Sequence, residues 1–316
     1  MARAYVTNYD SSDVTVIDTE TRQAITSISV GERPTGVAAL PNGSRVYVTN
    51  ADSNNVSVIN TLTNRVVATI PVRLRPIAVA ASPDGSRVYV ANQSSQTVSV
   101  IDTQSNQVTG TIPVGQSPSG ITVSPNGTRL YVTNFRSDTV SVINTQTNQV
   151  IREISVGQWP IGIAVTPNGR RVYVANSRSN NVSVINTQTN EVITSLSVGL
   201  TPAMVAITPN GTRAYVSNQY SNGLSIINTQ LNQVIETIPV ERQPFGLAVT
   251  PDGRYIYVVN SGVNNTSVID AQTNQTVDII SVGQAPFGIA ITNIPNNRGS
   301  RLKRSVAKRR KRRSNR

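Results

Sequence analysis

Residues 76–117 read PIAVAASPDGSRVYVANQSSQTVSVIDTQSNQVTGTIPVGQS, and close copies of this unit follow one another along the whole chain. The copies are marked by tyrosines spaced 42 residues apart, at Tyr5, Tyr47, Tyr89, Tyr131, Tyr173, Tyr215 and Tyr257. The same spacing links Pro34, Pro76, Pro118, Pro160, Pro202, Pro244 and Pro286. Self-similarity at a fixed period is the signature of a repeat architecture. The chain therefore consists of seven copies of one structural unit.

The unit predicts four short β-strands, at residues 77–82, 87–91, 98–102 and 108–114. Between the first two, Pro83, Asp84 and Gly85 form a hairpin signal, because proline fixes the approach and glycine accepts a positive φ. Four antiparallel strands in about 40 residues form one blade of a β-propeller. The first strand carries small residues such as Ala78 and Gly120, which suit the crowded position beside the axis. The sequence predicts an all-β, seven-bladed β-propeller.

The two ends of the chain supply complementary parts of one blade. The chain starts at the second strand of a unit and ends at the first strand. We expect residues 286–292 to pair with strands from residues 3–30, which closes the ring and removes two exposed edges. Residues 1–297 are expected to form the propeller, and residues 298–316 a separate basic tail.

Composition and charge exclude several functions and locate the positive charge. The sequence contains no cysteine and no histidine, which excludes disulfides, thiolate zinc sites and catalytic triads that use either residue. Of the 28 lysines and arginines, 11 lie in residues 298–316 without any acid, so the remaining 17 nearly balance the 16 acids. Nearly all of the net charge of +12 therefore belongs to the tail.

The tail has too few apolar residues to fold alone, and we expect it to be disordered. Its most basic part comprises Lys303, Arg304, Lys308, Arg309, Arg310, Lys311, Arg312 and Arg313. Such a segment suits attachment to nucleic acid or to an anionic membrane or wall polymer, or a role as a nuclear-localisation-like signal. A solubilising end with no partner is the alternative.

Asparagine and aspartate recur at equivalent positions, for example at Asn8 and Asp18, and could be taken for a ring of metal ligands. We expect them instead to hydrogen-bond nearby backbone and to shape turns, because a feature repeated seven times is architecture. No metal site and no organic cofactor are expected.

Residues that break the repeat are better candidates for function. Alternating strand directions place the loops after each second strand and the connections before each first strand on one face, called the top face below. Aromatic and arginine side chains gather in these segments, and such residues are typical of binding surfaces. The candidate ligand-binding residues are Trp159, Arg136, Phe135, Arg178, Tyr220, Phe245, Phe287, Arg242, Arg33 and Tyr9. The alternative is that they are scattered surface residues and plugs of the axial channel.

The segments at residues 5–8, 47–50 and 131–134 read Tyr-Val-Thr-Asn, and residues 89–92 and 173–176 read Tyr-Val-Ala-Asn. This pattern resembles the YVTN-type β-propeller repeat over about residues 1–293. The resemblance implies the propeller fold. Proteins of this type are found on microbial cell surfaces, and related propellers include sugar lactonases and cofactor-bearing oxidoreductases. No lactonase motif can be matched to residues of this chain.

These observations favour a non-enzymatic, monomeric binding or scaffold protein whose top face holds a protein or a small-molecule ligand and whose tail attaches to a polyanion. One alternative is a hydrolase or lactonase that uses the top-face carboxylates Glu32, Asp52 and Glu241. Another is a nucleic-acid-associated protein that acts mainly through the tail. No transmembrane run and no cleavable signal peptide are visible, which predicts a cytoplasmic protein, with the cell surface as the alternative.

Overall fold

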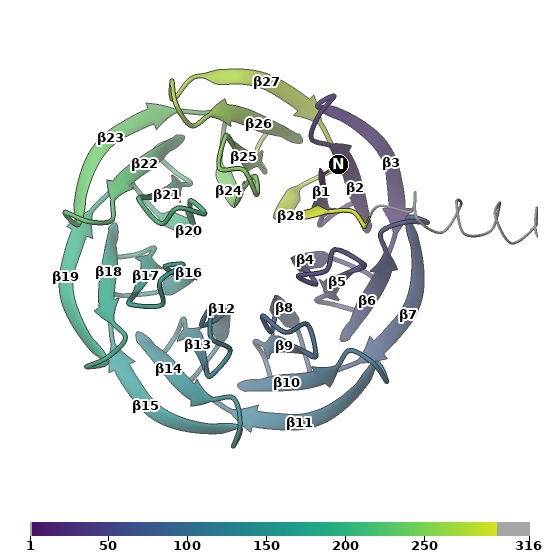
Figure 1. Ribbon diagram of the computed structural model, residues 1–316, viewed down its shortest axis with the longest axis horizontal. Helices are drawn as coiled ribbons and strands as arrows, with labels where there is room; N and C mark the ends of the chain where they lie inside the picture. The colour runs from purple at the N-terminus through teal and green to yellow at the C-terminus, as the bar shows by residue number, and fades with distance from the viewer. Residues whose placement is uncertain (1, 296–316) are drawn as a thin grey trace, which may run out of the picture.

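The computed structural model describes residues 2–295, which form a ring of seven four-stranded antiparallel sheets (Figure 1). Each sheet is one blade, and in six of the seven the strands follow chain order from the axis to the outer rim. The seven-bladed propeller predicted from the repeat is confirmed. The four strands predicted for residues 77–114 match β8 to β11 to within one residue at each end.

Blades 1 to 6 each consist of four consecutive strands. Blade 1 contains β4 (Pro34–Ala39), β5 (Arg45–Asn50), β6 (Asn55–Asn60) and β7 (Arg65–Pro71); blade 2 contains β8 (Pro76–Ala81), β9 (Arg87–Asn92), β10 (Thr97–Asp102) and β11 (Gln107–Pro113). Blade 3 contains β12 (Pro118–Val123), β13 (Arg129–Asn134), β14 (Thr139–Asn144) and β15 (Gln149–Ser155); blade 4 contains β16 (Pro160–Val165), β17 (Arg171–Asn176), β18 (Asn181–Asn186) and β19 (Glu191–Ser197). Blade 5 contains β20 (Pro202–Ile207), β21 (Arg213–Asn218), β22 (Gly223–Asn228) and β23 (Gln233–Pro239); blade 6 contains β24 (Pro244–Val249), β25 (Tyr255–Asn260), β26 (Asn265–Asp270) and β27 (Thr276–Ser281).

Blade 7 joins the two ends of the described chain. Its strands are β28 (Pro286–Asn293), β1 (Ala2–Asn8), β2 (Asp13–Asp18) and β3 (Gln23–Ser29). The innermost strand β28 pairs antiparallel with β1, from Ala2 opposite Asn293 to Asn8 opposite Pro286. In Figure 1 the yellow β28 lies beside the purple β1. The predicted closure of the ring is confirmed.

The inner strands approach one another so closely that several positions accept only glycine. A Cβ atom on Gly120 would lie 2.1 Å from the carbonyl oxygen of Ile161 in the next blade. Hydroxyl groups bridge the same junctions: the Thr7 hydroxyl donates to the Thr35 carbonyl at 2.6 Å, and that of Thr133 to the Ile161 carbonyl at 2.8 Å. The small residues predicted beside the axis therefore set the diameter of the ring.

Valine, isoleucine and tyrosine fill the space between blades. One cluster combines Tyr89 and Val98 of blade 2 with Ile121 and Leu130 of blade 3. The repeat tyrosines are at most 1% exposed, and desolvation raises the pKa of Tyr257 to about 12. Tyr257 therefore remains protonated, and the repeat tyrosines pack as large apolar side chains that end in a hydroxyl group.

Arginines at the start of the second strand bind a backbone carbonyl of the next blade. Arg45 donates to the Thr103 carbonyl at 2.7 Å, and Arg87 to the Thr145 carbonyl at 2.7 Å. Six positions make this contact: Arg3, Arg45, Arg87, Arg129, Arg171 and Arg213. These contacts tie six of the seven blades to the next, outside the apolar core; blade 6 has Tyr255 at this position.

The repeated amides and carboxylates have structural roles. The Asn50 side-chain amide donates to Asn55 Oδ1 at 2.7 Å and to the Ser57 hydroxyl at 2.9 Å, which joins β5 to β6. Asp102 Oδ1 accepts the backbone N–H of Ser105 at 2.7 Å and so shapes the turn after β10. Equivalent bonds from the asparagine side-chain amides recur around the ring, for example from Asn176 to the Ser183 hydroxyl at 2.9 Å.

The close approach of the inner strands predicts opposite effects for two glycines. Gly120→Ala places a methyl group against the Ile161 backbone and should lower the free energy of unfolding by about 1–3 kcal/mol. Gly110→Ala on β11 meets no atom nearer than 3.6 Å and should leave it unchanged or raise it by about 0.4–1 kcal/mol. Urea unfolding measures both variants, and equal effects would contradict the crowding of the axis.

The arginine contact predicts a second pair of effects. Arg171→Met removes the donor to the Thr229 carbonyl and to Asn232 Oδ1, and should lower the free energy of unfolding by about 1–2 kcal/mol. The neighbouring exposed Arg170 donates only through its backbone, so Arg170→Met should change it by less than about 0.5 kcal/mol. The same urea titration compares the two, and no difference between them would show that the contact adds nothing to stability.

Candidate functional site

The top face is built from two kinds of segment that the structure brings together at every blade. The loop after the second strand pairs with the connection before the inner strand: the Ala51 N–H donates to the Arg33 carbonyl at 3.0 Å, and the Phe135 N–H to the Ser117 carbonyl at 3.0 Å. The side chains of these segments therefore lie close together, as the alternation of strand directions predicts.

At two of the seven junctions between blades, three side chains from equivalent positions contact one another. In the first, Tyr9 follows β1, Arg33 precedes β4, and Asp52 follows β5. In the second, Phe135, Trp159 and Arg178 occupy the same positions three blades further round the ring. We call these the Arg33 cluster and the Trp159 cluster.

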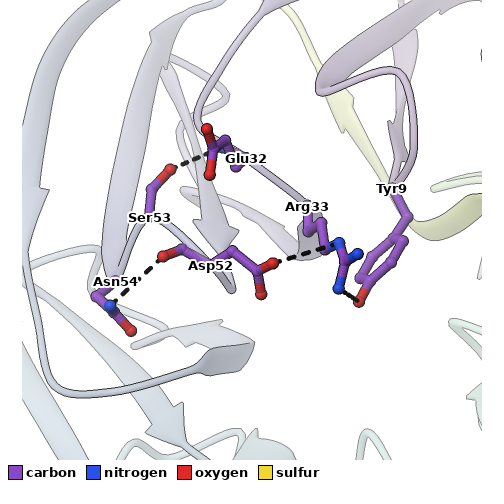
Figure 2. Close-up of polar contacts among 6 residues, drawn as sticks. All are labelled: Tyr9, Glu32, Arg33, Asp52, Ser53 and Asn54. Carbon is purple, nitrogen blue, oxygen red and sulfur yellow. Dashed lines mark hydrogen bonds and ion pairs between the residues drawn. The ribbon is translucent and has the colours of Figure 1, made fainter.

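The Arg33 cluster contains the one ion pair found among residues 2–295 (Figure 2). Arg33 Nε lies 3.3 Å from Asp52 Oδ2, and Arg33 Nη1 donates to the Tyr9 hydroxyl at 3.4 Å. The guanidinium also stands 5.2 Å from the centroid of the Tyr9 ring. Electrostatic interactions with Tyr9 and then with Asp52 raise the pKa of Arg33, so the guanidinium remains a cation. The Arg33 and Asp52 side chains are 53% and 43% exposed, and both are open to a ligand.

Short contacts within the loop hold Asp52 in place. The Ser53 hydroxyl accepts the Glu32 backbone N–H at 2.8 Å, and the Asn54 side-chain amide contacts the Asp52 carbonyl at 3.4 Å (Figure 2). Asn54 Oδ1 accepts the Arg75 backbone N–H at 2.8 Å. The loop that carries Asp52 is thereby joined to both of its neighbouring connections.

Aromatic rings extend from the Arg33 cluster to the axis. The Tyr9 ring lies 6.2 Å from that of Phe287, which lies 4.1 Å from that of Phe245. Phe287 also lines an axial cavity of about 140 Å³ between the inner strands. Phe245 is only 8% exposed, so it packs against Phe287 and leaves little surface for a ligand.

The Trp159 cluster has the same layout with different chemistry. The Phe135 and Trp159 rings stack at 5.3 Å with an interplanar angle of 28°, and the Arg178 guanidinium stands 5.0 Å from the Trp159 ring. Trp159 is 42% exposed. The cluster is a cationic aromatic surface, whereas the Arg33 cluster pairs a carboxylate with a guanidinium.

The remaining candidates on the top face lie outside both clusters. Arg136 lines a separate cavity beside Phe135. Tyr220 is 67% exposed and Arg242 is exposed. The ten candidates were predicted as one set on one face, and the contacts that some of them make across a junction were not predicted from the sequence. The three residues of each cluster are separated by the same numbers of positions in the sequence, and this shared spacing could have revealed both clusters.

A further cluster lies on the face opposite the top face, where the hairpin turns are and where no site was predicted. The Tyr255 ring lies 4.5 Å from the Arg22 guanidinium and 5.0 Å from that of Arg254. These residues line a groove of about 560 Å³ together with Glu20 and Asp252. Tyr255 stands where six other copies have an arginine, and that substitution was the signal in the sequence.

The predicted basic tail, residues 298–316, lies outside the described residues, and its binding to a polyanion stays a prediction. No helix among residues 2–295 is long and apolar enough to cross a membrane.

Two family models match parts of the chain. One is described as "Lactonase, 7-bladed beta-propeller" and matches residues 102–197, and the other as "YNCE-like beta-propeller" and matches residues 4–129. The comparison with curated proteins found no match. Both models describe propellers, and neither is the YVTN-type repeat, which stays a prediction.

Many solved structures share the fold at low sequence identity. A functionally unknown protein from Desulfotomaculum acetoxidans has a TM-score of 0.82 at 19% identity, over 93% of this chain and 99% of that one. A candidate 6-phosphogluconolactonase from Bacteroides uniformis has a TM-score of 0.78 at 19% identity, over 92% and 99%. Hydrazine synthase from Kuenenia stuttgartiensis has a TM-score of 0.75 at 23% identity, over 81% and 88%. These similarities show a shared propeller fold.

The comparisons correct one prediction. The lack of histidine, cysteine and any visible partner for Asp52 favoured a protein without enzymatic activity. The match to the lactonase model contradicts that prediction, and structural neighbours described as candidate lactonases agree with the match. The prediction was wrong because a carboxylate and a cation that are distant in the sequence can form an ion pair in the folded propeller, as Asp52 does with Arg33.

Proposed function

We propose that this protein is a lactone hydrolase whose reaction takes place at the Arg33 cluster. The observation that carries the proposal is the match to the lactonase family model, which supplies the reaction class. The Arg33 cluster supports it, because a carboxylate, a guanidinium and a phenol lie together there on an open face. Ester hydrolysis by these groups needs neither histidine nor cysteine.

Each of the three groups has a role that its chemistry allows. The Asp52 carboxylate accepts a proton from a water molecule, which adds to the carbonyl carbon of the lactone. The Arg33 guanidinium stabilises the negative charge that forms on the carbonyl oxygen. The Tyr9 hydroxyl accepts a hydrogen bond from Arg33, so its own proton is free to be donated to the ring oxygen.

The proton balance of the reaction closes on these residues. The bond between the carbonyl carbon and the ring oxygen breaks, and the ring oxygen leaves as a hydroxyl with the proton from Tyr9. The proton that Asp52 took from water then returns to Tyr9 through solvent. The product is the open-chain hydroxy acid, which ionises. The Phe287 ring, 6.2 Å from Tyr9, supplies an apolar wall for the carbon face of the substrate.

The proposal predicts that the full chain hydrolyses D-glucono-1,5-lactone faster than the spontaneous reaction, measured as acid release in a pH-stat. Asp52→Asn should lower kcat by about 100-fold or more, because it removes the group that accepts the proton. Arg33→Gln should have a comparable effect through the lost stabilisation of the oxyanion.

Asp10→Asn is the matched control. Asp10 occupies the repeat position of Asp52 in blade 7, where Ala285 stands in place of Arg33, and its charge is the smallest of the causes that act on the pKa of Arg33. This variant should keep its activity, and all variants should keep their melting temperature, because exposed ion pairs contribute little to stability. No hydrolysis above the spontaneous rate, or full activity in Asp52→Asn, would overturn the proposal.

A further inference from the structure

A cavity of about 370 Å³ opens on the top face between blades 2 and 3, away from the Arg33 cluster. Its volume lies within the range of about 300–1,000 Å³ that is typical of small-molecule sites. The lining residues are Arg75, Gln93, Ser94, Gln96, Gln116, Ser117, Phe135 and Arg136. They come from the top-face segments that precede β8 and β12 and that follow β9 and β13.

The cavity has a local cause in the sequence. Arg33 and Trp159 fill the equivalent place at the two clustered junctions, whereas the junction between blades 2 and 3 has the small Ser117. The backbone is the same at all three positions, with φ between 50° and 55°. The small Ser117 side chain therefore leaves open the space that a larger residue at this position would fill.

The charge of the lining selects for an anion. Arg75 and Arg136 both face the cavity, no lining residue is acidic, and neither arginine has an ion-pair partner among residues 2–295. Asp138 is the acid in the loop after β13, and its Oδ1 accepts the Trp159 backbone N–H at 2.8 Å. Two guanidinium groups around one cavity attract an anion, and each can pair with a carboxylate or a phosphate through two bonds.

The rest of the lining suits a sugar. Three glutamine amides and two serine hydroxyls can both donate and accept hydrogen bonds, as a ring of hydroxyl groups requires. Phe135 adds a flat apolar wall, which is held in place by its stacking against Trp159. Small-molecule sites commonly combine such a wall with a few converging polar groups.

We propose that this cavity binds an anionic sugar, a hexose that carries a carboxylate or a phosphate. Arg75 and Arg136 hold the anionic group, the glutamines bond the hydroxyls, and Phe135 packs against the ring. The site does not depend on lactone hydrolysis, because it shares no residue with the Arg33 cluster.

The chain carries its own probe for this site. Trp159 is the only tryptophan, and its ring is stacked on Phe135 in the wall of the cavity. The full chain is titrated with D-glucuronate, glucose 6-phosphate, D-glucose and inorganic phosphate, and tryptophan fluorescence and calorimetry are recorded. At least one of the two anionic sugars should bind about tenfold more tightly than both glucose and inorganic phosphate. The comparison of glucuronate with glucose 6-phosphate identifies which anionic group the site takes.

Three variants test the assignment. Arg75→Gln and Arg136→Gln should each weaken binding of the anionic sugar by about tenfold or more and leave glucose binding unchanged. Ser117→Gln should abolish binding by filling the cavity, and it should fold, because Gln243 occupies the same repeat position at φ 55°. Arg152→Gln, an exposed arginine on the outer strand β15, is the control and should bind as the native chain does.

Equal binding of glucose and the anionic sugars, binding of inorganic phosphate as tight as theirs, or full binding by Ser117→Gln would each overturn the proposal. The rate of gluconolactone hydrolysis is measured in the same variants. Loss of sugar binding with an unchanged rate, or of the rate with intact binding in Asp52→Asn, separates failure of one proposal from failure of the other.

Discussion

The pairing of β28 with β1 is the contact on which the rest of the structure depends. It converts a row of blades with two open edges into a closed ring, and it seats β28 against β4, where a Cβ on Gly288 would lie 2.4 Å from the Thr35 carbonyl. The same contact places Phe287, on β28, beside Tyr9, which follows β1, so the aromatic wall next to the Arg33 cluster depends on ring closure.

The repeat supplies seven nearly equal junctions, and a reaction needs an asymmetric one. The chain resolves this by varying the side chains at three positions while the backbone stays the same. With Tyr9, Arg33 and Asp52 the junction combines a base with a cation; with Phe135, Trp159 and Arg178 it becomes an aromatic surface. At the junction between blades 2 and 3, Ser117 takes the position of Arg33 and Trp159, and a cavity opens there. The inter-blade contacts of the Arg171 type lie elsewhere, so these changes leave the ring intact.

The fold could be predicted almost completely from the sequence, because each strand and turn is specified locally and then repeated. The strand boundaries of blade 2, the small residues beside the axis and the closure by β28 all follow from period and pattern. The site could be predicted only as a set of residues on one face. Its pairings depend on side chains from different blades, and Phe245, a candidate for ligand contact, is buried by Phe287, a neighbour distant in sequence. The Arg22 and Tyr255 contact was missed for the same reason.

Backbone strain gives an independent reason to place function on the top face. Four positions of the repeat have a left-handed φ, and three of them are occupied by residues other than glycine; such a φ costs most side chains free energy but suits asparagine and glycine. In the turn before the outer strand, six of the seven residues at this position are asparagine, Arg22 being the exception. In the connection before the inner strand the residues are Arg33, Arg75, Ser117, Trp159, Thr201, Gln243 and Ala285, and none is asparagine or glycine. Of these seven strained residues, Arg33 and Trp159 belong to the two clusters, and Arg75 and Ser117 line the cavity. Strain of this kind persists where the side chain itself is required, and here those side chains surround the proposed sites.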